Sequence, residues 1–169
     1  NRDGNRGGEI HAFETTDTYG YVCGEAQNAY DDLARYRRHM LMLRPSVLIL
    51  VDELVASQAS KFQWLLHAFE KFEIDDITST FVSKRHGAEL TGRLAASTNL
   101  SLGQTDAWPI APDKGYPTLT KPLPANRWHF TAETEDTSEK CRIVSAFSIQ
   151  APGEEAPDVD LDVSSDCVN

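Results

Sequence analysis

The hydrophobic residues of this chain occur in runs of strand length that are separated by turn signals. Residues 36–43, 47–55 and 61–69 form three successive runs of about nine residues, and Arg44-Pro45-Ser46 lies between the first two. Runs of this length with tight connections are typical of neighbouring antiparallel strands. The pattern therefore predicts an antiparallel meander over residues 36–69.

Residues 47–51 are hydrophobic at every position (Val-Leu-Ile-Leu-Val). A strand that is apolar at both parities is covered on both faces, so we expect this segment at the centre of a packed sheet. A buried helix is the alternative, but the β-branched residues and the flanking Pro45 and Ser46 favour a strand. Residues 26–33 are the one segment whose pattern would suit a short helix.

The rest of the chain continues this alternation of strands and turns. Residues 84–87 (Lys-Arg-His-Gly) have the composition of a turn. Residues 108–124 contain five of the eight prolines and cannot form regular structure, and loops of this length are often functional. Further strands are predicted at residues 8–13, 19–23, 77–83, 88–94, 100–104, 127–133 and 140–149.

These elements indicate an all-β fold, an antiparallel β-sandwich of the supersandwich kind with little helix and roughly nine to twelve strands. We assign residues 1–150 to this sandwich domain. Residues 151–169 contain six acidic residues and neither Lys nor Arg. Because hydrophobic and acidic residues alternate over 158–163, this segment is predicted to be an acidic C-terminal edge strand or an acidic tail.

The charge of the chain narrows the function classes. A net charge of −10 argues against general nucleic-acid binding, which needs a basic face to displace counterions. No apolar run approaches the ~20 residues of a membrane span. The first eight residues lack a starting Met and an apolar segment, so they are interpreted as a loop inside a longer protein rather than a signal peptide.

The three cysteines have no CxxC spacing, which argues against a zinc knuckle. Buried or free thiols are the first interpretation. One disulfide involving Cys141 or Cys167 is the alternative.

Asp52 and His67 are the first candidate pair for chemistry, because a carboxylate and an imidazole in neighbouring strands can ligate zinc or act as a base dyad. In a hairpin that turns near residues 57–58, the two would lie about 10 Å apart at ~3.4 Å per residue. That separation is too large for one metal ion. We therefore expect Asp52 to cap a turn or pair with an Arg and His67 to be hydrogen-bonded in the sandwich, with a site role as the alternative.

Arg35, Arg37 and Arg38 form, with His39 and Arg44, the basic cluster of the chain. Strand alternation places Arg35 and Arg37 on one face and Arg38 on the other. Guanidinium groups bind carboxylates and sulfates through two parallel hydrogen bonds, so these residues are candidate substrate ligands. Ion pairs with the acidic residues of the chain itself are the alternative.

The aromatic residues divide between core and candidate site. Trp64 and Trp128 lie in strand patterns and are expected in the core, whereas Trp108 begins the proline-rich loop and is the candidate platform for a sugar ring. His11 and His129 are expected to be lone, solvent-facing residues. A tyrosine whose pKa is lowered by nearby cations can act as a base; the tyrosines considered for this role are Tyr19, Tyr21, Tyr30 and Tyr36.

Six segments in order carry a resemblance to a known family. They are Gly-Gly-Glu-Ile at 7–10, Tyr-Val-Cys-Gly-Glu-Ala at 21–26, Ala-Tyr at 29–30, Arg-Arg-His-Met-Leu-Met-Leu-Arg-Pro at 37–45, Leu-Ile-Leu-Val-Asp-Glu-Leu at 48–54 and Phe-Gln-Trp-Leu-Leu-His at 62–67. Their succession resembles the C-terminal β-domain of heparinase II/III-like polysaccharide lyases, which follows an α/α toroid. The resemblance extends over about residues 7–74, and the remaining strands are compatible with it.

The resemblance implies β-elimination on an anionic, uronate-containing polysaccharide such as heparin, heparan sulfate or alginate. A Tyr and a His would act as acid and base, and two His and one Asp would hold a zinc ion. This chain contains neither the HxH nor the HNT motif of that zinc site. The catalytic and zinc residues are therefore expected upstream, in the toroid and first β-strands of a longer parent protein, so this fragment alone is expected to be inactive. The resemblance also implies a periplasmic or secreted location.

The alternative to a lyase fragment is a non-catalytic carbohydrate-binding or structural β-sandwich module. The chain has no GxSxG motif and no glycine-rich phosphate loop, which disfavours acyl transfer and nucleotide binding.

Overall fold

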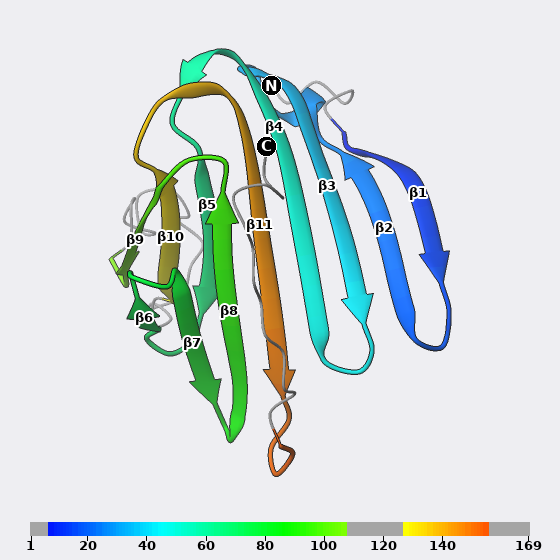
Figure 1. Ribbon diagram of the computed structural model, residues 1–169, viewed down its shortest axis with the longest axis vertical. Coiled ribbons are helices and arrows are strands. Elements are labelled where there is room, and N and C mark those ends of the chain that lie inside the picture. The colour runs from blue at the N-terminus through cyan, green and yellow to red at the C-terminus, as the bar shows by residue number, and fades with distance from the viewer. Residues whose placement is uncertain (1–6, 108–126, 156–169) are drawn as a thin grey trace, which may run out of the picture.

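A computed structural model describes residues 7–107 and 127–155, and in this part of the chain nearly all regular structure is β-strand (Figure 1). The expected helix at residues 26–33 is wrong, because the chain forms one short 3-10 turn (η1, Gln27–Ala29) and then enters a strand at Leu33. The strands are β1 (Glu9–Thr15), β2 (Tyr19–Glu25), β3 (Leu33–Leu43), β4 (Val47–Ser60), β5 (Gln63–Ala68), β6 (Glu73–Asp75), β7 (Thr80–Arg85), β8 (Ala88–Ala96), β9 (Leu100–Thr105), β10 (Trp128–Thr134) and β11 (Ser138–Gln150).

The strands form two antiparallel sheets, which confirms the predicted all-β sandwich. The large sheet has eight strands in the order β1-β2-β3-β4-β11-β8-β7-β6, and the small sheet has three in the order β5-β10-β9. Figure 1 shows the small sheet behind one half of the large sheet, while β1, β2 and β3 extend beyond it. The small sheet therefore covers the core side of β4, β11, β8 and β7, and within residues 7–107 and 127–155 no second layer covers β1 and β2.

The central position predicted for residues 47–51 is confirmed, because β4 lies between β3 and β11. Leu48 and Leu50 point toward the small sheet and belong to the core or pack against it. Ile49 and Val51 point to the opposite face, where they are half-buried. Both parities of this strand are thus at least half-covered, as the continuous hydrophobic run indicated.

The predicted meander over residues 36–69 is wrong at its third strand. β3 and β4 pair as expected, but β5 crosses to the small sheet and pairs with β10. The crossing is secured by two hydrogen bonds, in which the Phe62 amide donates to Thr134 Oγ1 and the Thr134 amide donates to the Phe62 carbonyl, both at 3.0 Å. The alternation of β5 identifies one buried face but does not say which sheet contains that face.

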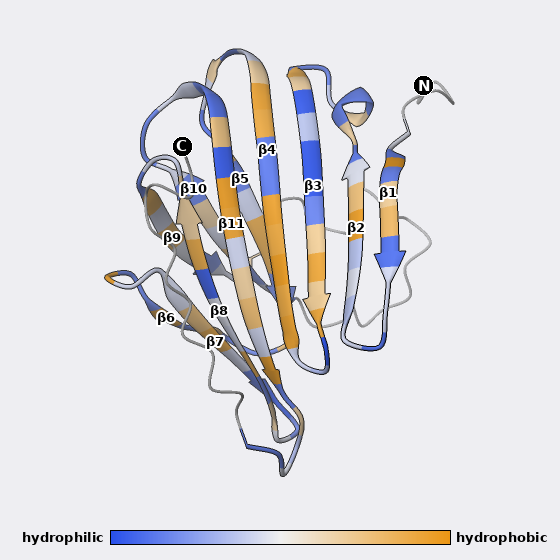
Figure 2. Ribbon diagram, turned by 45° about the vertical axis from the view of Figure 1, so that its right-hand side comes forward, coloured by the Kyte–Doolittle hydropathy of each residue, from blue (hydrophilic) through white to orange (hydrophobic). Residues whose placement is uncertain are grey.

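The core between the sheets is built from aromatic rings. Phe81 and Phe130 have centroids 4.5 Å apart, and Trp64 and Phe72 complete the cluster together with Phe147. Each such ring stabilises the fold by about 1.5–3 kcal/mol relative to an exposed one. The prediction that Trp64 is a core residue is confirmed, since it is only 5% exposed, and Trp128 packs half-buried against the same core. Figure 2 shows the continuous hydrophobic stretch of β4 in orange beside the hydrophilic part of β3 in blue.

The structure also bears on the predicted turn and on the cysteines. The turn predicted at residues 84–87 is confined to His86 and Gly87, which adopt φ angles of 51° and 82°, because Lys84 and Arg85 still belong to β7. Cys23 and Cys141 are buried free thiols. Cys167, the proline-rich loop at 108–124 and the acidic alternation at 158–163 lie outside the described residues. Among the described residues, the structure contains no helix long and apolar enough to cross a membrane.

Candidate functional site

A cleft of about 540 Å³ opens at the end of the sandwich where the chain passes from β4 of the large sheet to β5 of the small sheet. Its walls come from β3, β4 and the start of β5, together with the segment that precedes β3. Its floor is the edge of the core. The polar and aromatic residues that line it are Tyr30, Asp32, Tyr36, Arg38, Asp52, Lys61, Gln63 and Trp64.

Arg38 and Asp52 form a bidentate ion pair in this cleft. They are direct partners in the β3–β4 register, so both side chains project from the same face of the sheet. Arg38 Nε and Nη2 donate to Asp52 Oδ1 and Oδ2 at 2.6 and 2.8 Å. Asp52 is only 2% exposed, so its carboxylate depends on this guanidinium in place of water. The hydrogen bonds to Asp52 raise the pKa of Arg38 above its usual value.

The pair leaves one edge of the Arg38 guanidinium for a ligand. Asp52 accepts from Nε and Nη2, and the structure gives Nη1 no hydrogen-bond partner among the described residues. The Arg38 side chain is 37% exposed, so this edge reaches the cleft. A guanidinium held at one edge and open at the other can bind a carboxylate in a fixed orientation.

Two tyrosines stand beside this guanidinium. The rings of Tyr30 and Tyr36 pack edge to face with centroids 5.6 Å apart, and Arg38 Cζ lies 5.7 Å from the Tyr36 ring. Burial raises the pKa of Tyr36, and burial likewise raises that of Tyr21. These directions do not favour either residue as a base, and Tyr30 with Tyr36 is better suited to contact a sugar ring.

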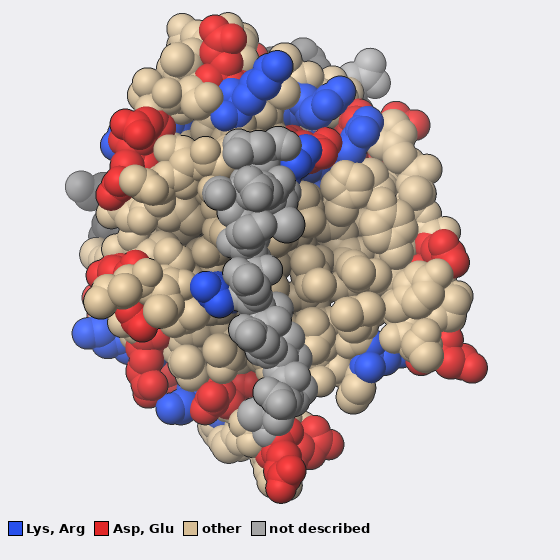
Figure 3. Space-filling view, in the orientation of Figure 1, with Lys and Arg blue, Asp and Glu red and all other residues tan. Residues whose placement is uncertain are grey.

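The predicted basic cluster is divided between the two faces of the large sheet. Arg38 lies on the core side, and the register places Arg35 and Arg37 together on the outer face, as strand alternation predicted. The outer face is largely neutralised: Arg142 Nη2 lies 3.3 Å from Glu53 Oε1, and Figure 3 shows basic and acidic side chains next to one another at its upper end. Arg35 is exposed beside these groups.

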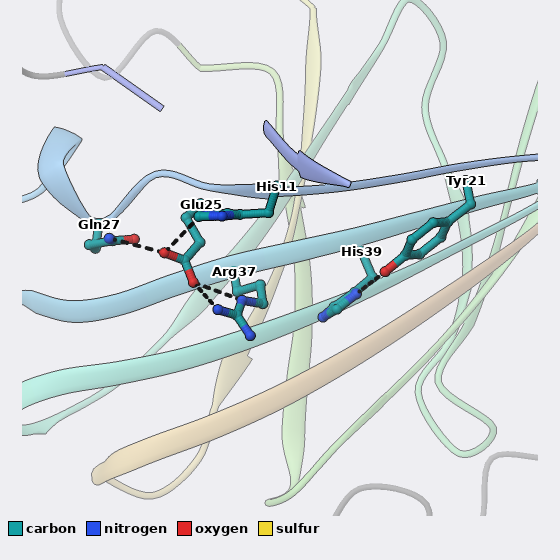
Figure 4. A network of polar contacts seen from close by, with 6 residues as sticks. All are labelled: His11, Tyr21, Glu25, Gln27, Arg37 and His39. Atoms are coloured by element: carbon teal, nitrogen blue, oxygen red, sulfur yellow. Dashed lines mark hydrogen bonds and ion pairs between the residues drawn. The ribbon is translucent and has the colours of Figure 1, made fainter. Parts of the chain in front are cut away.

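Arg37 belongs to a polar network on β1, β2 and β3 (Figure 4). Its guanidinium hydrogen-bonds Glu25, which also lies 3.2 Å from His11 and accepts from Gln27 at 3.3 Å. The hydrogen bond from Arg37 lowers the pKa of Glu25. Arg37 thus forms an ion pair within the chain, which was the alternative to binding a ligand. His11 is not the lone residue that was expected, because it faces this carboxylate.

Asp52 and His67 do not share a site. Asp52 faces the core from β4, whereas His67 lies on the outer face of the small sheet and stacks on His129 with ring centroids 4.3 Å apart. The expectation that His129 stands alone is also wrong, because β5 pairs with β10 in the small sheet and places His67 beside it. Within residues 7–107 and 127–155, no group of three or more His, Cys, Asp or Glu side chains could hold a metal ion. Trp108 lies outside the described residues and stays a prediction.

Sequence reasoning missed the cleft and the contribution of Lys61. Lys61 lies at the rim, with Nζ 3.6 Å from Glu133 Oε1. Tyr30, which was considered as a base, enters the cleft from the segment before β3. The one available signal was the polar Lys61 at the start of a hydrophobic run, which marks the point where the chain changes sheets.

No family model and no curated protein sequence matches this chain. Solved structures do match its fold. A heparinase III superimposes with a TM-score of 0.67 at 16% identity, over 86% of this chain and 22% of that protein. The heparan sulfate lyase HepC from Pedobacter heparinus matches with a TM-score of 0.65 at 15% identity, over 89% of this chain and 23% of that one. A second heparinase III structure matches with a TM-score of 0.62 at 9% identity.

The chain therefore spans between a fifth and a quarter of the length of these lyases. The resemblance noted in the sequence is confirmed at the level of the fold. This protein has the β-sandwich fold of a part of heparinase III-like lyases.

Proposed function

We propose that this chain is the C-terminal β-sandwich part of a heparinase II/III-like polysaccharide lyase that acts by β-elimination on uronate-containing polysaccharide. In this proposal the cleft at Arg38 forms one wall of the substrate site. The fold shared with heparinase III and HepC supports the class of protein. The single observation that carries the role of the cleft is the open edge of the Arg38 guanidinium beside Tyr30 and Tyr36.

The chemistry of the cleft suits a uronate. A uronate ring carries one carboxylate on an otherwise uncharged sugar, and the cleft offers one open guanidinium edge beside aromatic rings. The Asp52 carboxylate holds Arg38 in a fixed orientation, so little side-chain entropy is lost when a ligand binds. The remaining charges at the lining, Asp32 and Lys61, are of opposite sign.

In this proposal, the reacting groups come from elsewhere in the parent protein. β-Elimination needs a base for the proton next to the carboxylate and an acid for the leaving oxygen. Three of the candidate tyrosines, Tyr19, Tyr21 and Tyr36, have raised pKa values, which does not favour a base. We assign acid, base and a zinc ion to the upstream α/α toroid and first β-strands of the parent, and a periplasmic or secreted location to the whole protein.

The exposed apolar residues on β1 support the proposal that this chain is part of a larger protein. Ile10 and Phe13 on β1 are 70% and 72% exposed, and the small sheet does not reach them. Exposed apolar residues that share a sheet face mark a contact surface. We assign this surface to a neighbouring domain of the parent.

The isolated chain is expected to release no unsaturated uronate from heparan sulfate or alginate, measured by absorbance at about 232 nm, where such alkenes absorb. The parent protein is expected to show this activity. A parent that binds but never cleaves these polysaccharides would favour a non-catalytic carbohydrate-binding module. Product formation by the isolated chain would refute the assignment of the reacting groups to upstream residues.

Binding at the cleft is tested with a tetrasaccharide of glucuronate and the isolated chain. Arg38→Lys keeps the positive charge beside Asp52 but loses the second edge of the planar fork, so the dissociation constant is expected to rise about tenfold in calorimetry. Arg37→Lys is the matched control, because Arg37 lies next in sequence but on the opposite face. Equal losses from the two substitutions would contradict the role of the cleft.

A further inference from the structure

The outer face of the large sheet carries a group of cations at one end of β3, β4 and β11. We define the outer-face patch as Arg35, Lys140 and Arg142. Arg35 and Lys140 are both register partners of Val55 in β4, and Arg142 lies in the next row opposite Glu53. Because register partners project from the same face, the three cationic side chains stand together. Figure 3 shows basic side chains gathered at the upper end of this face.

The outer-face patch keeps an excess of positive charge. Arg142 is paired with Glu53, with Nη2 3.3 Å from Oε1. Arg35 and Lys140 are both exposed, and no ion pair within residues 7–107 and 127–155 includes either of them. A cavity of about 320 Å³ opens between the three cations. The patch can therefore accept further carboxylates without displacing an existing pair.

Further along β4 and β11 the same face is apolar. Val51 pairs with Val144, and Ile49 pairs with Ala146. The small sheet lies on the other side of these strands, and in the described part of the chain no second layer covers this side of β4 and β11. Apolar rows that end in a group of cations suit a ligand in which hydrophobic and acidic residues share one short segment.

The chain itself contains a segment of this composition, residues 156–169. Hydrophobic and acidic residues alternate over 158–163, and the segment contains neither Lys nor Arg. Its hydrophobic residues in that alternation are Val159, Leu161 and Val163, and its acids are Asp158, Asp160, Asp162 and Asp166. The segment therefore complements both parts of the outer face, the apolar rows and the unpaired cations.

The turn after β11 directs the chain back along this strand. Over residues 151–154 (Ala-Pro-Gly-Glu), the Glu154 amide donates to the Ala151 carbonyl at 3.1 Å and Gly153 has a φ angle of 82°. A β-turn of this kind reverses the direction of the chain. β11 already has β4 and β8 as neighbours, and the small sheet covers its core side. Among the described elements, the outer face is thus the side of β11 left open to the returning chain.

The segment is long enough to reach the patch. Lys140 lies ten positions before the last residue of β11, which is about 34 Å at ~3.4 Å per residue. An extended chain that starts at residue 155 covers this distance in about ten residues. Asp162 would then reach the level of Arg142, and Asp166 would reach the level of Lys140.

We infer that residues 156–169 lie across the outer face of the large sheet, with their hydrophobic residues on the apolar rows and their aspartates on the outer-face patch. An exposed ion pair is weak by itself, so the apolar contact holds the segment and the ion pairs fix where its acidic end lies. This contact is on the opposite face of β3 and β4 from Arg38, so it leaves the cleft open.

Carbodiimide cross-linking of the full chain tests this placement, because the reagent joins a carboxylate directly to an amine in contact with it. At about 50 mM salt, mass spectrometry is expected to find Lys140 joined to Asp162 or Asp166. The product of Lys84 with Glu73 is the internal reference, since Nζ lies 3.3 Å from Oε2. At about 0.5 M salt the Lys140 product is expected to fall roughly fivefold relative to the reference, because exposed charges are then screened.

Three variants separate the parts of the contact and leave the reacting amine in place. Arg35→Gln and Arg142→Gln are each expected to lower the yield of the Lys140 product about threefold, the effect of one exposed ion pair. Leu161→Ser is expected to lower it about fivefold, because it removes apolar contact. Lys61→Gln is the matched control, since it removes one positive charge at the cleft, and it is expected to change the yield less than about 1.5-fold.

The outcomes that would overturn the inference are distinct. One is that the reference product forms but the Lys140 product does not. A second is that the segment cross-links equally to Lys61, Lys84 and Lys140, which would show general charge attraction. An equal mixture of ordinary and isotope-labelled chains gives the third: products within one isotope support the contact, whereas products that join the two isotopes would place the segment of a second copy on this face.

Discussion

Arg38→Ala is expected to lower the free energy of unfolding by about 3 kcal/mol, because it leaves a buried carboxylate without its partner. Asp52 is 2% exposed and accepts hydrogen bonds on both carboxylate oxygens from Arg38. The value lies at the lower end for a buried pair because the Arg38 side chain is itself 37% exposed. Urea unfolding, followed by tryptophan fluorescence, measures the change at constant m-value.

Two further variants separate the lost charge pair from lost packing. Arg38→Met with Asp52→Leu removes both charges and is expected to recover most of the stability, since a hydrophobic pair of similar volume replaces a buried ion pair at little cost. Arg37→Ala is the control on the opposite face, and we expect a change of no more than about 1 kcal/mol for its more exposed pair. A double variant as unstable as Arg38→Ala would show that shape rather than charge dominates this site.

Gly92→Ala is expected to destabilise the protein by about 3 kcal/mol, the upper range for overpacking a core. A Cβ atom at Gly92 would lie 2.3 Å from Cζ of Phe81 and 2.7 Å from both of its Cε atoms. Phe81 is 1% exposed and packs against Phe72 and Phe130, so its ring has no room to withdraw. The midpoint of urea unfolding would report the loss.

Gly103→Ala provides the matched control, because Gly103 also lies within a strand but has nothing within 4 Å of an added Cβ. A neutral or slightly stabilising change, within about 0.5 kcal/mol, is expected there because Ala has less backbone freedom to lose than Gly. If Gly92→Ala proved equally mild, the Phe81 ring would have to occupy a different position in the core.

Most strands could be predicted because their signal is local. In β10 and β11 the hydrophobic residues alternate with a period of two. The structure buries Phe130 and Ala132 in β10 and Cys141, Ile143 and Phe147 in β11, while Ile149 near the end of β11 is exposed. The turn between β7 and β8 was equally clear, since its glycine, Gly87, occupies a left-handed conformation. The composition of residues 26–33 suits a helix, but the structure has no α-helix there. The chain instead enters β3 at Leu33, and this strand is stabilised by pairing with β2 and β4.

The candidate sites depended more on contacts between distant residues. The pairing of Asp52 with an arginine was among the expectations, but the identity of Arg38 follows from the register of β3 against β4. His67 had been considered with Asp52, and its true neighbour His129 is 62 positions away in the sequence. No local pattern could indicate that pair, because a strand carries the same alternation whichever strand it joins.

The sequence by itself determined which residues are extended, which of their faces are buried and that the chain forms a β-sandwich, because each depends on side-chain periodicity and turn chemistry over a few positions. Only the tertiary structure decided that β5 joins the small sheet instead of pairing with β4 in the large sheet. That one crossing opens the cleft at Arg38, separates His67 from Asp52 and brings His67 beside His129. The reason is physical: the choice of strand partner is set by packing of the whole core, and that energy is shared among residues far apart in the chain.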